Sequence, residues 1–137
     1  LGTIIRAAAW FGIRTIICSG NSVDVFDPKV IQASMGALLN VEVYYPELDL
    51  ILQEAIKAGL PVYGTFLEGE SVYGAELEDR GIIVFGNESK GISGNLESLV
   101  TKKLFIPGFP VSEHGVESLN VGMAASIVLS EFARRRR

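Results

Sequence analysis

Short β-prone runs alternate with helical stretches along nearly the whole chain, and this alternation restricts the fold more than any other feature. The runs rich in Ile, Val, Phe and Tyr are the predicted strands, at 15–18, 41–44, 61–66, 81–85 and 103–106. Apolar residues at helical spacing predict helices over 4–11, 28–35, 46–57 and 96–100, and a long helix from Ser118 to the end. Since strands joined through helices run parallel, the pattern predicts an α/β fold with a mostly parallel sheet flanked by helices.

The length and composition of the chain narrow its class. The 137 residues suffice for one compact domain, 1–137, and no apolar run is long enough to span a bilayer. The net charge of −4 argues against a wholly basic nucleic-acid binder. Cys18 and His114 are each alone, so no disulfide framework and no metal site is expected, and a reducing, cytoplasmic setting is the simplest expectation. Because Leu1 is not a Met and 2–5 reads as the inside of an element, we expect an excised domain whose N-terminal part is missing.

The segment 86–91, Gly-Asn-Glu-Ser-Lys-Gly, follows a continuously apolar strand that is expected to be buried on both faces. Ligands of parallel sheets bind beyond the carboxyl ends of the strands, so this turn is a candidate site, although an ordinary turn between strand and helix has the same pattern. It is neither a phosphate-binding P-loop nor a dinucleotide motif. Glu88 either orients a ribose or an arginine, or caps the next turn.

Three further features each have two interpretations. Ser118 is a good N-cap for the last helix, whereas Asn120 is not explained by capping and is a candidate ligand contact. Arg6 lies in an apolar helix, where it either meets an anion or extends along the helix surface to solvent. The run 134–137 of four arginines is either a solvated helix end or a phosphate contact.

Taken in order, three segments resemble the SpoU (TrmH-like) branch of the SPOUT RNA methyltransferases. The first is 1–12, Leu-Gly-Thr-Ile-Ile-Arg and the residues up to Gly12, and the second is 83–92, Ile-Val-Phe-Gly-Asn-Glu-Ser-Lys-Gly-Ile. The third joins Ile106-Pro107 to 117–121, Glu-Ser-Leu-Asn-Val, and continues into the last helix up to Arg134. The segment 29–36 is also similar to the family's intervening region, so the resemblance covers nearly the whole chain.

The resemblance implies a C-terminal trefoil knot, an obligate homodimer, and methylation of a ribose 2'-hydroxyl in tRNA or rRNA with S-adenosyl-L-methionine as the cofactor and without a metal. By motif position, the implied cofactor contacts are Thr65, Phe66, Leu67, Gly86, Ile106, Ser118 and Leu119. The implied catalytic residues are Arg6, Glu88, Ser118 and Asn120. In this scheme Arg6 binds the substrate phosphate, Glu88 holds Arg6 or its dimer mate, and Ser118 and Asn120 place the hydroxyl.

The chain also departs from the family pattern. The asparagine that usually precedes the first motif and the N-terminal RNA-binding domain are absent, the loop 108–116 is longer, and Gln32 stands where many relatives carry arginine. The alternatives to a ribose methyltransferase are a non-catalytic RNA-binding or assembly module of the same fold, a base methyltransferase of the same superfamily, and a generic nucleotide-binding α/β domain.

Overall fold

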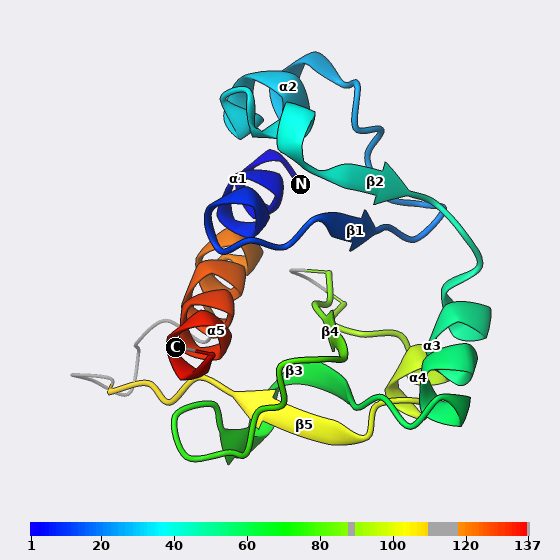
Figure 1. Ribbon diagram of the computed structural model, residues 1–137, viewed down its shortest axis with the longest axis vertical. Helices are drawn as coiled ribbons and strands as arrows, with labels where there is room; N and C mark the ends of the chain where they lie inside the picture. The colour runs from blue at the N-terminus through cyan, green and yellow to red at the C-terminus, as the bar shows by residue number, and fades with distance from the viewer. Residues whose placement is uncertain (88–89, 110–117, 137) are drawn as a thin grey trace.

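Parallel strands and helices alternate in the computed structural model, which describes residues 1–87, 90–109 and 118–136 (Figure 1). The helices are α1 (Gly2–Trp10), α2 (Pro28–Ser34), the 3-10 helix η1 (Ala37–Asn40), α3 (Leu48–Lys57), α4 (Gly94–Glu97) and α5 (Val121–Arg135). The strands are β1 (Thr15–Ile17), β2 (Glu42–Tyr44), β3 (Val62–Ser71), β4 (Ile82–Val84) and β5 (Lys102–Phe105). None of the described helices is long and apolar enough to cross a membrane.

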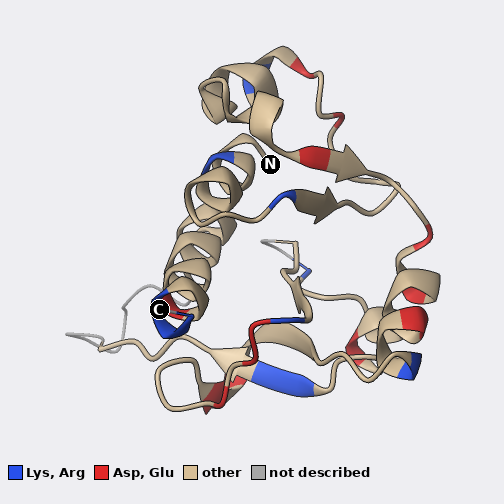
Figure 2. Ribbon diagram, in the orientation of Figure 1, with Lys and Arg blue, Asp and Glu red and all other residues tan. Residues whose placement is uncertain are grey.

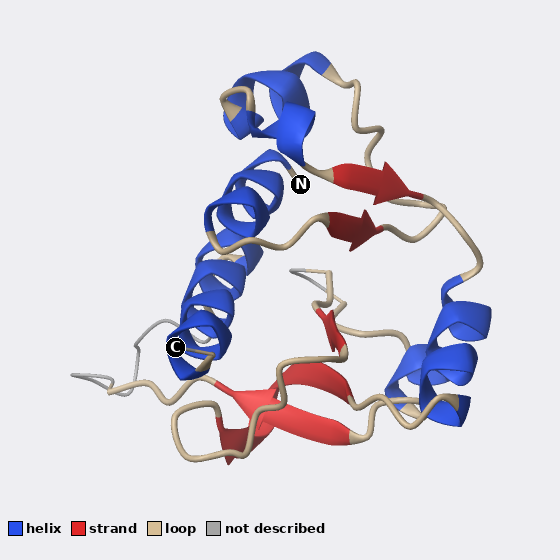
Figure 3. Cartoon of the chain, viewed as in Figure 1, coloured by secondary structure: helices blue, strands red, loops and turns tan. Residues whose placement is uncertain are grey.

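The strand pairings between these elements are all parallel, which confirms the predicted α/β class. The described hydrogen bonds divide the strands into two ladders, with orders β1–β2 and β4–β3–β5. Figure 3 shows α1 and α5 along one side of the two ladders and α3 and α4 along the other. The prediction that 81–85 is covered on both faces holds in part: Ile83 packs against one buried cluster and its neighbours Ile82 and Val84 pack against another, but all three residues of β4 stay only half-buried.

Helices α1 and α5 lie side by side and join the two ladders. A Cβ atom on Gly122, at the start of α5, would collide with Thr3 Oγ1, at the start of α1, so the two N-terminal ends are in close contact. At the other end, Arg136 Nη2 donates to the backbone oxygen of Phe11 over 2.9 Å, so the helices run parallel. Val128 of α5 lies in the same buried cluster as Tyr63 of β3, and the two helices therefore link the β4–β3–β5 ladder to the N-terminal part of the chain.

Arginine side chains bind the C-terminal end of α5 to neighbouring backbone. Arg135 donates to the carbonyl oxygens of Val72 (3.0 Å) and Tyr73 (2.7 Å), also to that of Ala75, and to the buried carboxylate of Glu131 (2.9 Å). Hydrogen bonds from Arg134, and then from Arg135, lower the pKa of Glu131 from 4.5 to about 2. Neither interpretation of the run 134–137 therefore holds for Arg135, which binds the turn after β3.

Candidate active site

The carboxyl ends of β3, β4 and β5 bring three predicted cofactor segments to one edge of the sheet. In the parallel register Gly64 pairs with Val84, and Thr65 pairs with Leu104, so 65–67, Gly86 and Ile106 follow these pairs at the same end. Thr65 Oγ1 donates to the carbonyl oxygen of Val84 over 3.3 Å, which ties the first two segments together. This is the edge at which parallel sheets bind ligands.

Strand β3 leaves its ladder where the predicted contacts Phe66 and Leu67 lie. Leu104 of β5 pairs with both Thr65 and Glu70, so the residues 66–69 form a bulge between the two pairings. The side chain of Leu67 is 78% exposed there. The predicted strand 61–66 ended too early for this reason, since pairing resumes at Glu70. Gly69 was the available signal, because a glycine inside a strand often marks a bulge.

The turn that follows Gly86 is closed by backbone hydrogen bonds between its two ends. Asn87 and Gly91 exchange two backbone hydrogen bonds of 3.1 and 2.8 Å. A Cβ atom on Gly86 would overlap the backbone of Gly91 and Ile92, and Gly91 itself has φ +67°. Both glycines are thus required by the turn's own geometry. Glu88, at the centre of the turn, lies outside the described residues, so its predicted role stays a prediction.

The last helix begins later than predicted, and this changes the role assigned to Asn120. The helix starts at Val121, and Asn120 is its N-cap, accepting hydrogen bonds from the backbone nitrogens of Gly122 (2.8 Å) and Met123 (3.4 Å). The prediction of a helix that begins at Ser118 is wrong, as is the argument that capping leaves Asn120 unexplained. The tight contact of Gly122 with Thr3 fixes where the helix can begin, and an asparagine in extended conformation then caps it.

Arg6 lies on the helix that packs against this cap. It follows Thr3, which contacts Gly122, by one helical turn, and because the two helices run parallel it stands level with the first turns of α5 although 114 residues separate it from Asn120. Arg6 is exposed and forms no hydrogen bond or ion pair with any residue that the structure describes. Ser118 and Leu119 are also exposed and directly precede the cap.

Part of the predicted site lies outside the residues that the structure describes. The structure brings together Thr65, Phe66, Leu67, Gly86 and Ile106 at the strand ends, and it packs the helix that carries Arg6 against the start of α5. Residues 110–117, which connect Ile106 to Ser118, are not described. Most of the longer loop 108–116 and His114 lie in that segment, and the predicted knot depends on its path.

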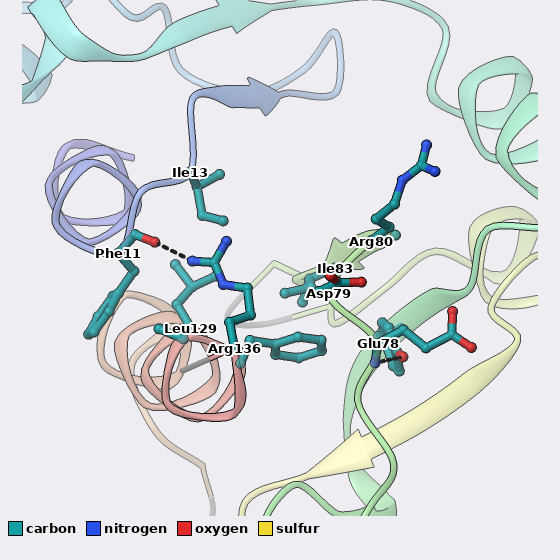
Figure 4. Close-up of a pocket in the computed structure, with 12 residues that line it drawn as sticks. Phe11, Ile13, Glu78, Asp79, Arg80, Ile83, Leu129 and Arg136 are labelled. Atoms are coloured by element: carbon teal, nitrogen blue, oxygen red, sulfur yellow. Dashed lines mark hydrogen bonds between the residues drawn. The ribbon is translucent and has the colours of Figure 1, made fainter.

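Two hollows at different ends of the strands could also hold a ligand. A cavity of about 70 Å³ lies at the amino ends of the strands, between Ile13, Ile83 and the Arg136 side chain (Figure 4). It is too small for a nucleoside, since ligand pockets usually exceed about 300 Å³. An open groove of about 640 Å³ lies at the carboxyl ends of β1 and β2 and is lined by Ser19, Tyr45, Glu47, Asp49 and Asn95, among others. Among the described residues that line it there is neither Lys nor Arg, so it does not suit a phosphate backbone.

The sequence relatives of the chain are methyltransferases. A sequence model of the SpoU rRNA Methylase family matches residues 1–130. An uncharacterized tRNA/rRNA methyltransferase of Synechocystis is 33% identical over 99% of this chain and 49% of that relative. The 23S rRNA (uridine(2479)-2'-O)-methyltransferase of Streptomyces viridochromogenes is 32% identical over 99% of this chain and 48% of its own length. The chain thus spans about half the length of the curated relatives it matches.

The solved structures that resemble this one are of the same kind. A protein of the TrmH family from Porphyromonas gingivalis aligns with a TM-score of 0.90 and 45% identity over 98% of this chain and 54% of that chain. The SpoU methyltransferase AviRb from Streptomyces viridochromogenes, solved in complex with the cofactor AdoMet, aligns with a TM-score of 0.85 and 29% identity over 98% of this chain and 55% of that chain. By sequence and by fold, this chain belongs to the SpoU rRNA methylase family.

Proposed function

We propose that this protein methylates a ribose 2'-hydroxyl in rRNA or tRNA with S-adenosyl-L-methionine. The observation that carries the proposal is the convergence of 65–67, Gly86 and Ile106 at the carboxyl ends of three parallel strands, in a chain of the SpoU rRNA methylase family. Relatives named as 23S rRNA 2'-O-methyltransferases support the reaction. The AdoMet complexes of SpoU and rRNA methyltransferases support the cofactor.

The residues at the strand ends suit the chemical character of that cofactor. Leu67 is 78% exposed and so leaves apolar surface beside backbone at this edge, which fits an adenine ring. Leu119, which is 42% exposed just before α5, would add apolar surface to the site. Backbone at Gly86, Ile106 and Ser118 would complete the contacts. The bound cofactor would supply an electrophilic methyl group on a positively charged sulfur.

The protein would contribute to catalysis by holding the ribose in place and by helping the 2'-hydroxyl to lose its proton. The 2'-hydroxyl is a weak nucleophile: as its oxygen gains the methyl group and S-adenosylhomocysteine leaves, its proton must pass to a base, which here would be the substrate phosphate. Arg6 would bind the adjacent phosphate and stabilise negative charge on the oxygen, since its guanidinium has no partner among the described residues. Glu88 would orient this arginine, in its own or in the partner subunit. Ser118 would contact the ribose, and Asn120 would fix the start of α5 beneath it.

We further propose that the protein is a homodimer that pairs through the α1–α5 face. Trp10 at the end of α1 is 83% exposed and Met123 in the first turn of α5 is 58% exposed, and such large apolar side chains on two packed helices suit a protein interface. We also propose that the C-terminal segment is threaded as a trefoil knot, as the family implies, and that the protein acts in the cytoplasm, where its RNA is found.

The RNA partner must be held by few cations. Apart from the arginines at the end of α5, Lys and Arg are spread over several elements, whereas acidic residues are frequent in α3 and in the segment between β3 and β4 (Figure 2). Arg135 and Arg136 are engaged with backbone oxygens, which leaves Arg6 as the cation best placed for a phosphate. Binding of RNA by this chain alone is therefore expected to be weak and steeply salt-dependent.

Detection of the modified ribose tests the reaction. The purified protein is incubated with S-adenosyl-L-methionine labelled in its methyl group and with rRNA or tRNA, and the RNA is then hydrolysed in alkali. Because a 2'-O-methyl group blocks cleavage of the next phosphodiester, the label is expected in alkali-resistant dinucleotides. Label in single nucleotides would contradict ribose methylation and favour a base methyltransferase. Absence of label with folded, cofactor-binding protein and every RNA tested would favour a non-catalytic module.

A further inference from the structure

Residue Lys103 of β5 lies beneath the bulge that carries the proposed cofactor contacts. The bulge 66–69 begins after Thr65 and ends before Glu70, and both of these residues pair with Leu104, the neighbour of Lys103. Gly69 closes the bulge with φ +131°, and a Cβ atom there would lie 2.6 Å from the carbonyl oxygen of Lys103. The end of the bulge is therefore pressed against the backbone of this lysine. Bulges of this kind change the direction of a strand, often next to active sites.

The side chain of Lys103 holds the start of the same bulge. Its ammonium lies 4.7 Å from the centre of the Phe66 ring, within the range of a cation–π contact. The Phe66 ring also packs on the backbone of Gly64, where a Cβ atom would lie 2.7 Å from Phe66 Cε2. The ring is thus fixed by the strand and by the lysine, and the backbone that follows it is fixed with it.

An ion pair from a neighbouring helix keeps the lysine in this position. Lys103 Nζ lies 2.8 Å from Glu97 Oε1 of α4, with both side chains about four-tenths exposed. The hydrogen bond with Glu97 raises the pKa of Lys103, although partial burial opposes this, and the charges of Glu97 and of Glu68, inside the bulge, add to it. The lysine therefore connects α4, the Phe66 ring and the bulge in one local network.

We propose that Lys103 is a positioning residue for the methyl donor, because it holds Phe66 and with it the backbone of 65–67 in the shape that binds the cofactor. This inference rests on the proposed function of the site. Lys103 would act in the ground state and the transition state alike, since it shapes the binding backbone and does not touch the reacting atoms. Its loss should accordingly raise the KM for S-adenosyl-L-methionine and leave kcat nearly unchanged.

The test uses substitutions at Lys103 and at its neighbour. Lys103→Met keeps the length of the side chain and removes the charge, and it is expected to raise the Kd for S-adenosylhomocysteine, measured by calorimetry, and the KM for the cofactor about fivefold. Lys103→Arg retains a cation for both Phe66 and Glu97 and should restore binding to within about twofold of the wild type. Lys102→Met is the matched control, since Lys102 lies on the opposite face of β5 and donates to the carbonyl oxygen of Glu76.

The outcomes separate this inference from the proposed function. Wild-type protein that is folded and binds no S-adenosylhomocysteine would overturn the proposed function and this inference with it. If the wild type binds and Lys103→Met binds equally well, the inference alone is overturned. Equal weakening by Lys102→Met and Lys103→Met, or failure of Lys103→Arg to restore binding, would also overturn it, because a general loss of charge or of stability would then explain the effect. Phe66→Leu should reproduce Lys103→Met, and the two should not be additive if the lysine acts through the ring.

Discussion

At the C-terminal end of the α1–α5 pair, Arg135 and Arg136 donate to backbone oxygens of other segments, and Glu131 accepts from Arg134 and Arg135. Near the N-terminal end of the same pair, Arg6 is exposed and has no partner among the described residues. Both ends carry arginine on packed helices, but only one end uses its guanidinium groups to hold the protein together. Arginine at one end is thus expected to determine stability, and at the other end activity.

Removal of Arg6 is expected to have the largest effect and tests whether this residue serves activity and not stability. Arg6→Ala is expected to lower kcat for ribose methylation by about 10²–10³-fold, because a cation aimed at developing negative charge is lost. The free energy of unfolding should change by less than about 0.5 kcal/mol, since an exposed side chain without a described partner is removed. Activity is measured by methyl transfer to RNA and stability by urea unfolding. A stability loss as large as that of Arg135→Ala would show that Arg6 is structural too.

The opposite end should respond in the opposite way. Arg135→Ala removes contacts to three carbonyl oxygens and leaves the buried Glu131 with one partner fewer, so it is expected to lower the free energy of unfolding by about 3 kcal/mol. Arg134→Ala is the control: this side chain is 68% exposed and should cost less than about 1 kcal/mol. Urea unfolding of both variants gives the comparison. Equal losses would mean that the carbonyl contacts of Arg135 contribute nothing measurable.

Acid should weaken the same end selectively. Since folding lowers the pKa of Glu131 from 4.5 to about 2, its stabilising effect is fully present above pH 4.5 and is lost as the pH falls towards 2. At about pH 6, Glu131→Gln is expected to be less stable than the wild type by about 2 to 3 kcal/mol. By about pH 2 this difference should be nearly gone. A difference that stays constant across this range would show that the charge of Glu131 is not what stabilises the helix end.

The smallest expected effect concerns the cap of α5. Asn120→Ala removes the acceptor for the backbone nitrogens of Gly122 and Met123 and should cost about 1 kcal/mol in unfolding free energy, whereas Asn120→Asp, which can still cap, should cost a few tenths. If the amide also serves the reaction, both variants will lose activity beyond this change in stability. Loss of activity only in Asn120→Ala would assign the residue to capping.

Local sequence signals predicted most elements of this fold and failed where contacts between distant segments decide. The predicted helix 28–35 does begin at Pro28, and the structure adds that the carboxylate of Asp27 caps it by accepting from the backbone nitrogen of Lys29. Ser118 and Asn120 are equally good caps in sequence, and only the packing of Gly122 against Thr3 selects one of them. The bulge at 66–69 and the carbonyl contacts of Arg135 also depend on distant segments, β5 and the turn after β3.

For the site, too, the sequence predicted what depends on the order of the strands and not what depends on the packing of distant helices. The order of strands and turns was enough to place Thr65, Gly86 and Ile106 at one edge, because parallel strands end on the same side. The packing of the Arg6 helix against the start of α5 required two helices from opposite ends of the chain to lie in parallel, which no local pattern contains.

Binding of S-adenosylhomocysteine to the wild-type protein tests the central claim, a methyl-donor site at the carboxyl ends of β3, β4 and β5. Isothermal titration calorimetry is expected to give a Kd in the micromolar range, about −8 kcal/mol. Arg6→Ala should bind equally well, because Arg6 is assigned to the RNA phosphate. The account would be contradicted if the folded wild-type protein gave no heat of binding and also failed to retain radiolabelled S-adenosylhomocysteine in a filter-binding assay.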